Sequence, residues 1–231
     1  MIVYFSGMAQ PPAISILIAT YNTPFPLVKR ALDSLWNQTY QDFEVILVDD
    51  GSSQDPQNLL FNLCKRHEDR LLFLRQKNQG QSRAINRAVS LSSGRYLSIL
   101  DADDEYLPEH LQACLDQMDS YDLIASTTRT VVAKKEDYFV TDRHHPERLI
   151  HVDDCILFAT LFGKREVFKS KAFVDGYAAD ADFFEWAKKR YRVGKVDLRT
   201  YVYYRNHPDS TCERMKIKFS GKKENASFRQ N

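Results

Sequence analysis

The sequence predicts an α/β domain in which a mostly parallel sheet is flanked by helices and followed by a mixed α+β second half. Short apolar runs alternate with segments of helical periodicity from residue 14 to about residue 120. Such closely spaced units require parallel strands joined by right-handed helical crossovers. We therefore expect a single domain over residues 1–231, divided into a ligand-binding half at 14–120, a second half at 121–212 and a flexible basic tail at 213–231.

Each apolar run of the first half has the composition of a strand buried on both faces. The runs are continuous in apolar and β-branched residues rather than alternating, which is typical of parallel sheets. The expected strands cover residues 14–19, 43–48, 71–74 and 96–100.

Helical periodicity follows each of these strands. The first helix is indicated by apolar residues at i, i+3, i+4 and i+7, namely Val28, Ala31, Leu32 and Leu35. Thr23 is expected to cap this helix, with Pro24 at its first position. The same spacing predicts helices around residues 59–64, 84–89 and 107–118.

The second half has a different pattern. Two strand-like segments, 123–132 and 138–141, flank a charged turn and predict an antiparallel ribbon. Residues 143–154 are polar and histidine-containing, and we interpret them as a solvated loop because no metal-ligand spacing is present. Helices at 165–170 and 181–191 and a strand at 196–204 complete this half.

Composition excludes several classes of protein. The net charge of +1 and pI near 7.7 give no basic field for nucleic acid. The four cysteines form no C-x-x-C pair, so neither a zinc knuckle nor a disulfide framework is indicated. The apolar runs are much shorter than the roughly 20 residues of a membrane span. We expect a cytoplasmic enzyme or binding protein.

An acidic junction ends the fourth predicted strand. Asp101, Asp103, Asp104 and Glu105 follow the apolar run directly. Carboxylates at the carboxyl end of a central parallel strand face the crevice where open α/β sheets bind ligands, and their oxygens suit Mg²⁺ or Mn²⁺. The alternative is that Asp103 or Asp104 only caps the helix that opens near Pro108.

Four motifs in this order resemble those of the family 2 inverting glycosyltransferases with the GT-A fold. They are residues 18–22 (IATYN), 48–52 (VDDGS), 100–104 (LDADD) and 203–210 (YYRNHPDS). The resemblance covers roughly residues 14–210. It implies a nucleotide-sugar-binding first half and a second half that holds the acceptor and the catalytic base.

The resemblance also implies a set of nucleotide-binding residues. Tyr21 would stack on the base, Asp50 would accept hydrogen bonds from it, and Arg83 would lie near the diphosphate. A turn held by Asp-Gly-Ser chemistry is a competing role for Asp50, and both roles are compatible. The full implied set is Thr20, Tyr21, Asn22, Asp49, Asp50, Arg83, Asp101 and Ala102.

Metal binding is implied for Asp103, with His207 reaching the metal or the diphosphate from the second half. An ordinary exposed histidine is the alternative for His207. The general base is Asp180 or Asp182, because the family's usual Glu-Asp pair is replaced here by alanine and aspartate. Counting back from Tyr191 favours Asp180, and matching Trp186 favours Asp182. We prefer Asp180, and the alternative is that one of the two is the helix cap.

The predicted function is metal-dependent, inverting transfer of a sugar from a nucleotide-sugar donor, preferably a UDP-sugar, to a hydroxyl of a glycan or lipid-linked acceptor. The basic run from Arg214 to Lys223 suggests peripheral membrane contact, with a solvated tail as the alternative. One rival is a catalytically silent nucleotide-sugar or glycan-binding protein. Another is a sugar nucleotidyltransferase, which is expected to open with a glycine-rich phosphate loop that residues 20–23 lack.

Overall fold

The computed structural model describes residues 10–53, 58–143, 145, 147–176 and 178–205. His207 and the basic tail lie outside these residues. The chain forms two compact units, one of Met1–Arg129 with Ile156–Val202 and one of Thr130–Cys155 with Tyr203–Asn231.

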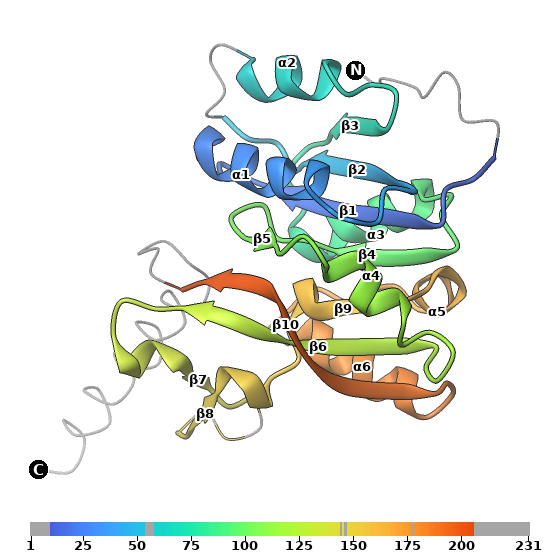
Figure 1. Cartoon of the computed structure of the whole chain (residues 1–231). Helices are drawn as coiled ribbons and strands as arrows, with labels where there is room; N and C mark the ends of the chain where they lie inside the picture. Colours follow the sequence, from blue (N-terminus) through green and yellow to red (C-terminus); the bar gives the residue numbers. More distant parts are fainter. Residues whose placement is uncertain (1–9, 54–57, 144, 146, 177, 206–231) are drawn as a thin grey trace, which may run out of the picture. The chain divides into compact units, whose positions relative to one another are not determined.

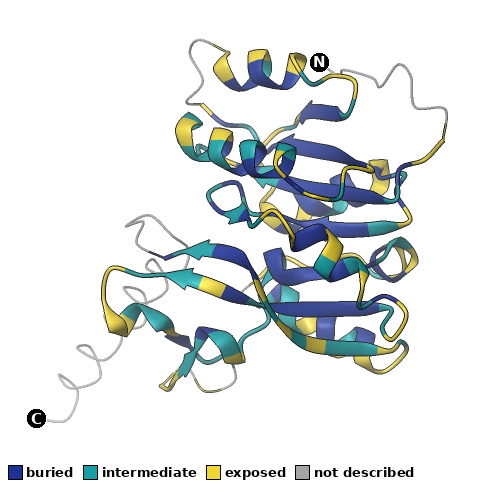
Figure 2. Cartoon of the chain, in the orientation of Figure 1, coloured by how far each residue is buried: buried dark blue, intermediate teal, exposed yellow. Residues whose placement is uncertain are grey.

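The larger unit is built on an eight-stranded sheet with the order β3-β2-β1-β4-β9-β6-β10-β5 (Figure 1). Its first four strands pair in parallel, as predicted. These strands are β1 (Ile14–Thr20), β2 (Phe43–Asp49), β3 (Leu71–Arg75) and β4 (Tyr96–Ile99). Figure 2 shows that β1 and β2 are buried along almost their whole length, because the sheet is covered on both faces.

The helices between these strands confirm the predicted periodicity. They are α1 (Phe25–Trp36), α2 (Leu59–Lys65) and α3 (Gln81–Leu91), and the apolar residues that predicted α1 are all fully buried. The expected cap of α1 is wrong. Pro24 rather than Thr23 occupies the cap position, and the Pro24 carbonyl accepts hydrogen bonds from the amides of Leu27 (2.9 Å) and Val28 (3.3 Å).

Antiparallel strands extend the sheet beyond β4. They are β5 (Glu105–Tyr106), β6 (Leu123–Val131), β9 (Leu161–Lys164) and β10 (Val193–Tyr204). β9 was not predicted, and it pairs with both β4 and β6. A Cβ at Gly163 would lie 2.6 Å from the carbonyl oxygen of Asp122, so only glycine lets these backbones approach.

The predicted ribbon between residues 123–132 and 138–141 is wrong. In the smaller unit β7 (Phe139–Thr141) pairs instead with β8 (Leu149–His151), which lies in the segment expected to be a loop. The charged turn forms the 3₁₀ helix Lys135–Tyr138 rather than a hairpin turn. Another 3₁₀ turn, Val152–Asp154, follows β8.

One buried core of the larger unit packs the sheet against α3 and against two helices of the second half. These helices are α5 (Arg165–Ser170) and α6 (Ala179–Lys188), while α4 (His110–Leu115) follows β5, and a 3₁₀ turn covers Phe158–Thr160. The ring of Phe183 lies 4.4 Å from that of Phe173 and 5.5 Å from that of Phe168. This aromatic group fixes α6 against the segment that precedes it.

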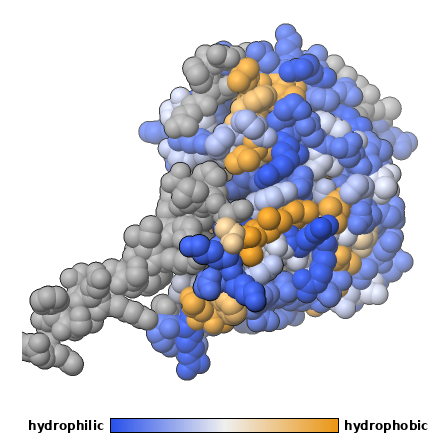
Figure 3. Space-filling model, turned by 60° about the vertical axis from the view of Figure 1, so that its left-hand side comes forward, coloured by the Kyte–Doolittle hydropathy of each residue, from blue (hydrophilic) through white to orange (hydrophobic). Residues whose placement is uncertain are grey.

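The face of the molecule drawn in Figure 3 is mainly polar among the residues that the structure describes. On the face drawn in Figure 3, hydrophilic residues predominate and hydrophobic residues form separate small patches among the residues placed there. Within the described parts of the chain, no helix is both long and apolar enough to cross a membrane.

Asp122 joins three segments of the larger unit. Its carboxylate accepts hydrogen bonds from Lys164 Nζ (2.7 Å) and from the amide (2.9 Å) and Nη2 (3.2 Å) of Arg192. Burial acts to raise the pKa of Asp122, but these hydrogen bonds and the charge of Lys164 outweigh it and lower the pKa to about 2.

We expect Asp122→Asn to lower the free energy of unfolding by about 1–2 kcal/mol at pH 7, because hydrogen bonds to a carboxylate are lost. The folded-state pKa lies below the ordinary value of 3.8. The contribution of the Asp122 carboxylate to the free energy of unfolding is therefore complete above about pH 4, and it disappears as the pH falls from 4 to about 2. Urea titrations of both proteins across this range measure it, and a difference that stays constant with pH contradicts the assignment.

Candidate functional site

Three neighbouring strands end in one row. Thr20 pairs with Asp49, and Asp49 pairs with Arg75, so the last residues of β1, β2 and β3 are in register. The residues that directly follow these strands are Tyr21 after β1, Asp50 after β2 and Gln76 after β3. Adjacent strands lie about 4.8 Å apart, so the first and last of these three residues are separated by about two strand spacings. One ligand can reach all three side chains.

The loop after β1 presents an aromatic ring. Asn22 has a left-handed backbone (φ 51°), its amide donates a hydrogen bond to Ser52 Oγ (2.8 Å), and its Oδ1 accepts one from the Ser53 amide (2.8 Å). Thr20 is buried, whereas Tyr21 is 53% exposed. The loops after β1 and β2 are thus tied together with the Tyr21 ring left facing solvent.

Asp49 and Asp50 are both buried and both hydrogen-bonded. Asp49 accepts from the Ser52 amide (2.9 Å) and pairs with Arg75 Nε (3.3 Å). Asp50 Oδ1 accepts from Gln76 Nε2 (2.8 Å), and its Oδ2 accepts from the Gly80 amide (2.7 Å). The turn role considered for Asp50 is therefore filled by Asp49, which accepts the Ser52 amide, whereas the Asp50 carboxylate holds the loop between β3 and α3.

The acidic junction lies at the end of β4. Asp101 Oδ1 accepts a hydrogen bond from Gln81 Nε2 (2.9 Å), while Ala102 is buried. Burial, followed by the negative charges of Asp103 and Asp180, raises the pKa of Asp101 to about 7 against the lowering effect of Gln81. Carboxylates from β4 and α6 are therefore close enough to repel one another.

Asp103 and Asp104 have different environments. The Asp103 backbone carbonyl accepts a hydrogen bond from Arg30 Nη2, but among the described residues none donates to the Asp103 carboxylate. Asp104 is 1% exposed and accepts a hydrogen bond from the hydroxyl of Tyr201 on β10 (2.5 Å). Asp103 thus remains available to a ligand, and Asp104 anchors the junction to the sheet.

The alternative that Asp103 or Asp104 caps the following helix is wrong. α4 begins at His110 with Glu109 in the cap position. β5 and the turn around Pro108 lie between the junction and this helix. A helix-cap role therefore does not account for the carboxylates.

The two candidate bases lie in the first turn of α6. Ala178, with φ 64°, occupies the cap position, so the alternative that Asp180 or Asp182 is the helix cap is wrong. Residues two apart on a helix point about 200° from each other. The side chain of Asp180 contributes to the electrostatic field at Asp101, so it lies on the side of the acidic junction.

α3 holds the segment that leads into α6. Arg83, the candidate for diphosphate contact, donates through Nε to Asp175 Oδ2 (2.9 Å), and both side chains are more than half exposed. Asn86 donates to the Phe173 carbonyl (2.8 Å) and accepts from the Phe173 amide (2.9 Å). These contacts, with the one from Gln81 to Asp101, place α6 beside the end of β4.

Sequence reasoning missed three residues of this arrangement: Gln76, Gln81 and Tyr201. The two glutamines lie in a polar stretch without periodicity, so no pattern distinguishes them. Tyr201 belongs to a predicted strand, but its partner Asp104 is 97 positions away in the sequence. Only the strand order β6-β10-β5 brings the two together.

The donor set fits Mg²⁺ or Mn²⁺ held partly by a substrate. Within the described ranges, no group of three His, Cys, Asp or Glu side chains is arranged to hold a metal ion on its own. Mg²⁺ is ordinarily bound by only one or two carboxylates together with substrate phosphates. The open Asp103 carboxylate, in a region of negative charge, meets that requirement.

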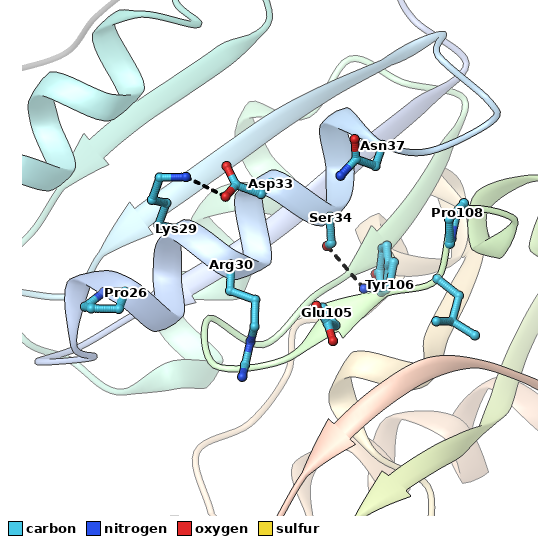
Figure 4. A pocket seen from close by; sticks show the side chains of 10 residues that line it. Pro26, Lys29, Arg30, Asp33, Ser34, Asn37, Glu105, Tyr106 and Pro108 are labelled. Carbon is cyan, nitrogen blue, oxygen red and sulfur yellow. Dashed lines mark hydrogen bonds and ion pairs between the residues drawn. The ribbon is translucent and has the colours of Figure 1, made fainter.

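A separate cavity of about 420 Å³ lies between α1 and β5 (Figure 4). Its walls carry the ion pair of Lys29 with Asp33 (2.6 Å), and Ser34 Oγ accepts a hydrogen bond from the Tyr106 amide (3.2 Å). Arg30 links this cavity to the backbone of the acidic junction. Of its lining residues, only Glu105 belongs to the predicted acidic junction.

An exposed ring and a group of carboxylates at the carboxyl edge of a parallel sheet define a class of α/β proteins that bind ligands at this edge. Within that class, the model of the glycosyl transferase family 2 matches residues 15–178. The match covers more than half of the chain, so the protein belongs to glycosyl transferase family 2.

Curated relatives agree with the family. An uncharacterized glycosyltransferase of Methanocaldococcus jannaschii is 32% identical over 115 residues, which is 49% of this chain and 40% of that protein. Chondroitin synthase of Escherichia coli is 41% identical over 110 residues, 48% of this chain and 16% of the synthase. The chain thus spans less than half the length of these relatives.

Solved structures share the fold. S. aureus TarS 1–349 in complex with UDP-GlcNAc superposes with a TM-score of 0.65 at 19% identity, covering 87% of this chain and 60% of that one. The mannosyltransferase PcManGT of Pyrobaculum calidifontis, in complex with GDP-Man and Mn²⁺, gives 0.68 at 19% identity, covering 91% and 61%. These likenesses confirm the predicted GT-A type fold.

We expect Tyr201→Phe to lower the free energy of unfolding by about 1–3 kcal/mol, because a buried carboxylate loses one donor. Tyr40→Phe is the matched control, since its hydroxyl makes no hydrogen bond to the described residues. Urea denaturation of the three proteins measures the effect. Equal stability of Tyr201→Phe and the wild type would show that Tyr201 does not anchor Asp104.

Proposed function

We propose that this protein transfers a sugar from a nucleoside-diphosphate donor to a hydroxyl of a glycan or lipid-linked acceptor, with a divalent metal ion and with inversion at the anomeric carbon. One observation supports this most strongly. An exposed aromatic ring follows β1, and an open carboxylate follows the neighbouring strand β4, where a carboxylate from α6 acts on the same acidic junction.

The donor's nucleoside would bind at the row of strand ends. The exposed ring of Tyr21 offers a stacking surface for a base, and base stacking on an aromatic side chain contributes about 1–3 kcal/mol. Thr20, Asn22, Asp49 and Asp50 would fix the shape of this pocket through their hydrogen bonds. Asp101 and Ala102 would lie against the ribose.

The diphosphate would lie over the acidic junction. Asp103 would hold Mg²⁺ or Mn²⁺ together with the phosphate oxygens, and such an ion supplies the positive charge that stabilises the diphosphate leaving group. Arg83 would add a charge from the start of α3, exchanging its exposed partner Asp175 for phosphate. Exposed ion pairs contribute little to stability, so this exchange costs little.

Asp180 would act as the general base. Its position beside Asp101 supports it over Asp182, since an acceptor hydroxyl must lie between the base and the donor's anomeric carbon. Asp180 would take the proton as the acceptor oxygen attacks in line from the face opposite the leaving diphosphate. One displacement of this kind inverts the anomeric configuration.

The donor base and the acceptor are inferred from similarity. The likeness to a protein bound to UDP-GlcNAc supports a UDP-sugar, and the likeness to one bound to GDP-Man and Mn²⁺ supports a divalent metal. Chondroitin synthase as a relative supports a glycan acceptor.

Asp103→Asn is expected to weaken UDP binding in the presence of Mn²⁺ by at least about 10-fold, because a neutral amide is a poorer ligand for a hard cation. Asp119→Asn, at an exposed position on the turn after α4, serves as the control. Isothermal titration calorimetry with and without Mn²⁺ gives both affinities. If the two variants bind UDP alike, Asp103 is not the metal ligand.

Asp180→Asn should lower donor turnover by about 10²-fold or more with little change in donor affinity, whereas Asp182→Asn should retain most of it. An amide preserves size but cannot take a proton. The assay follows release of nucleoside diphosphate from the UDP-sugar that the wild type hydrolyses fastest. Loss of turnover in Asp182→Asn alone would transfer the role to that residue, and full activity of both would exclude a base in this turn.

A further inference from the structure

Gln76 has a fixed place in the row of strand ends that also holds Tyr21. It is the first residue after β3, in the same row as Tyr21 and Asp50. Its backbone amide donates a hydrogen bond to the Asp49 carbonyl (2.9 Å), which holds its main chain against β2. Its side chain is only partly buried, whereas Asp50 is 3% exposed. Of the two, Gln76 is the side chain that a base could reach more directly.

Asp50 determines which way the Gln76 amide points. Gln76 Nε2 donates to Asp50 Oδ1 (2.8 Å), and a carboxylate can only accept hydrogen bonds. Turning the amide over would bring its carbonyl oxygen against the carboxylate and lose this bond. Gln76 Oε1 therefore points away from Asp50, and it accepts no hydrogen bond from any residue in the described ranges.

Asp50 itself is held from the other side. The amide of Gln79 donates to both of its oxygens (3.0 and 3.2 Å), and the amide of Gly80 donates to Oδ2 (2.7 Å). Gly51 keeps this loop close, since a Cβ there would lie 2.8 Å from the amide of Asn78. The carboxylate cannot rotate without losing these bonds, so the orientation of the Gln76 amide is preorganised.

We propose that Gln76 selects the donor's base by presenting a carbonyl oxygen to a ring N–H group. This inference rests on the proposed function, because it assigns base recognition within the same nucleotide site. Uracil and guanine carry such an N–H on the edge used in pairing, whereas cytosine and adenine carry a lone pair at the corresponding ring nitrogen. Cytosine or adenine would place the lone pair of its ring nitrogen against Gln76 Oε1. Two acceptors would then face each other, and Gln76 Oε1 would stay unpaired. The site therefore takes uridine or guanosine diphosphates over their cytidine and adenosine counterparts.

The test compares Gln76→Met with Gln79→Met. Methionine keeps the length of glutamine but has no hydrogen-bonding amide, and Gln79 contacts Asp50 only through its backbone amide. Affinities for UDP, GDP, CDP and ADP are measured by isothermal titration calorimetry in Mn²⁺. Thermal unfolding of each variant checks that it is folded.

The wild type should bind UDP or GDP at least about 10-fold more tightly than CDP and ADP. Gln76→Met should lose most of this preference, mainly through weaker binding of the favoured diphosphate, and Gln79→Met should keep it. If the wild type and a folded Gln76→Met show the same preference among the four diphosphates, Gln76 does not select the base, and the proposed function stands. A wild type that favours CDP or ADP has the same consequence. A wild type that binds none of the four refutes the nucleotide site and this inference with it.

Discussion

The in-register parallel pairing of β1 with β2 and of β2 with β3 is the constraint on which the rest of the site depends. Because Thr20, Asp49 and Arg75 align, the residues that leave the sheet next form one row. If any strand slipped by one residue, its polar end would move by about 3.3 Å along the sheet. Each of its buried side chains would also move to the opposite face of the sheet. The buried apolar strands and the polar row therefore specify the same register.

α3 connects this row to the second half of the chain. Its first turn donates a hydrogen bond from Gln81 to Asp101, and its middle holds the backbone of Phe173 through Asn86. The Phe173 ring then packs on Phe183 of α6. A carboxylate on α6 is brought to the end of β4 by this chain of contacts, although the two are about 80 residues apart in sequence.

The parallel half was predictable because its strands are buried on both faces and its helices have clear apolar stripes. The strand ends, and with them Tyr21, Asp50, Asp101 and Asp103, could be located from the same pattern. β9 was not predictable, since its four residues, which include Gly163, show no periodicity. The pairing of β7 with β8 was missed because β8 lies in the polar stretch 143–154, which has the composition of a loop. Gln76 was missed because its role depends on the orientation that Asp50 imposes, which no motif records.

Proton NMR of a panel of nucleotide sugars incubated with the wild-type protein and Mn²⁺ tests most directly whether this protein is an inverting glycosyltransferase. We expect that one uridine or guanosine donor is consumed, that nucleoside diphosphate is released, and that the first free sugar has the inverted anomeric configuration. A retained configuration would contradict the single displacement. Failure to consume any donor, when no donor raises the melting temperature either, would contradict the assignment of a nucleotide-sugar site.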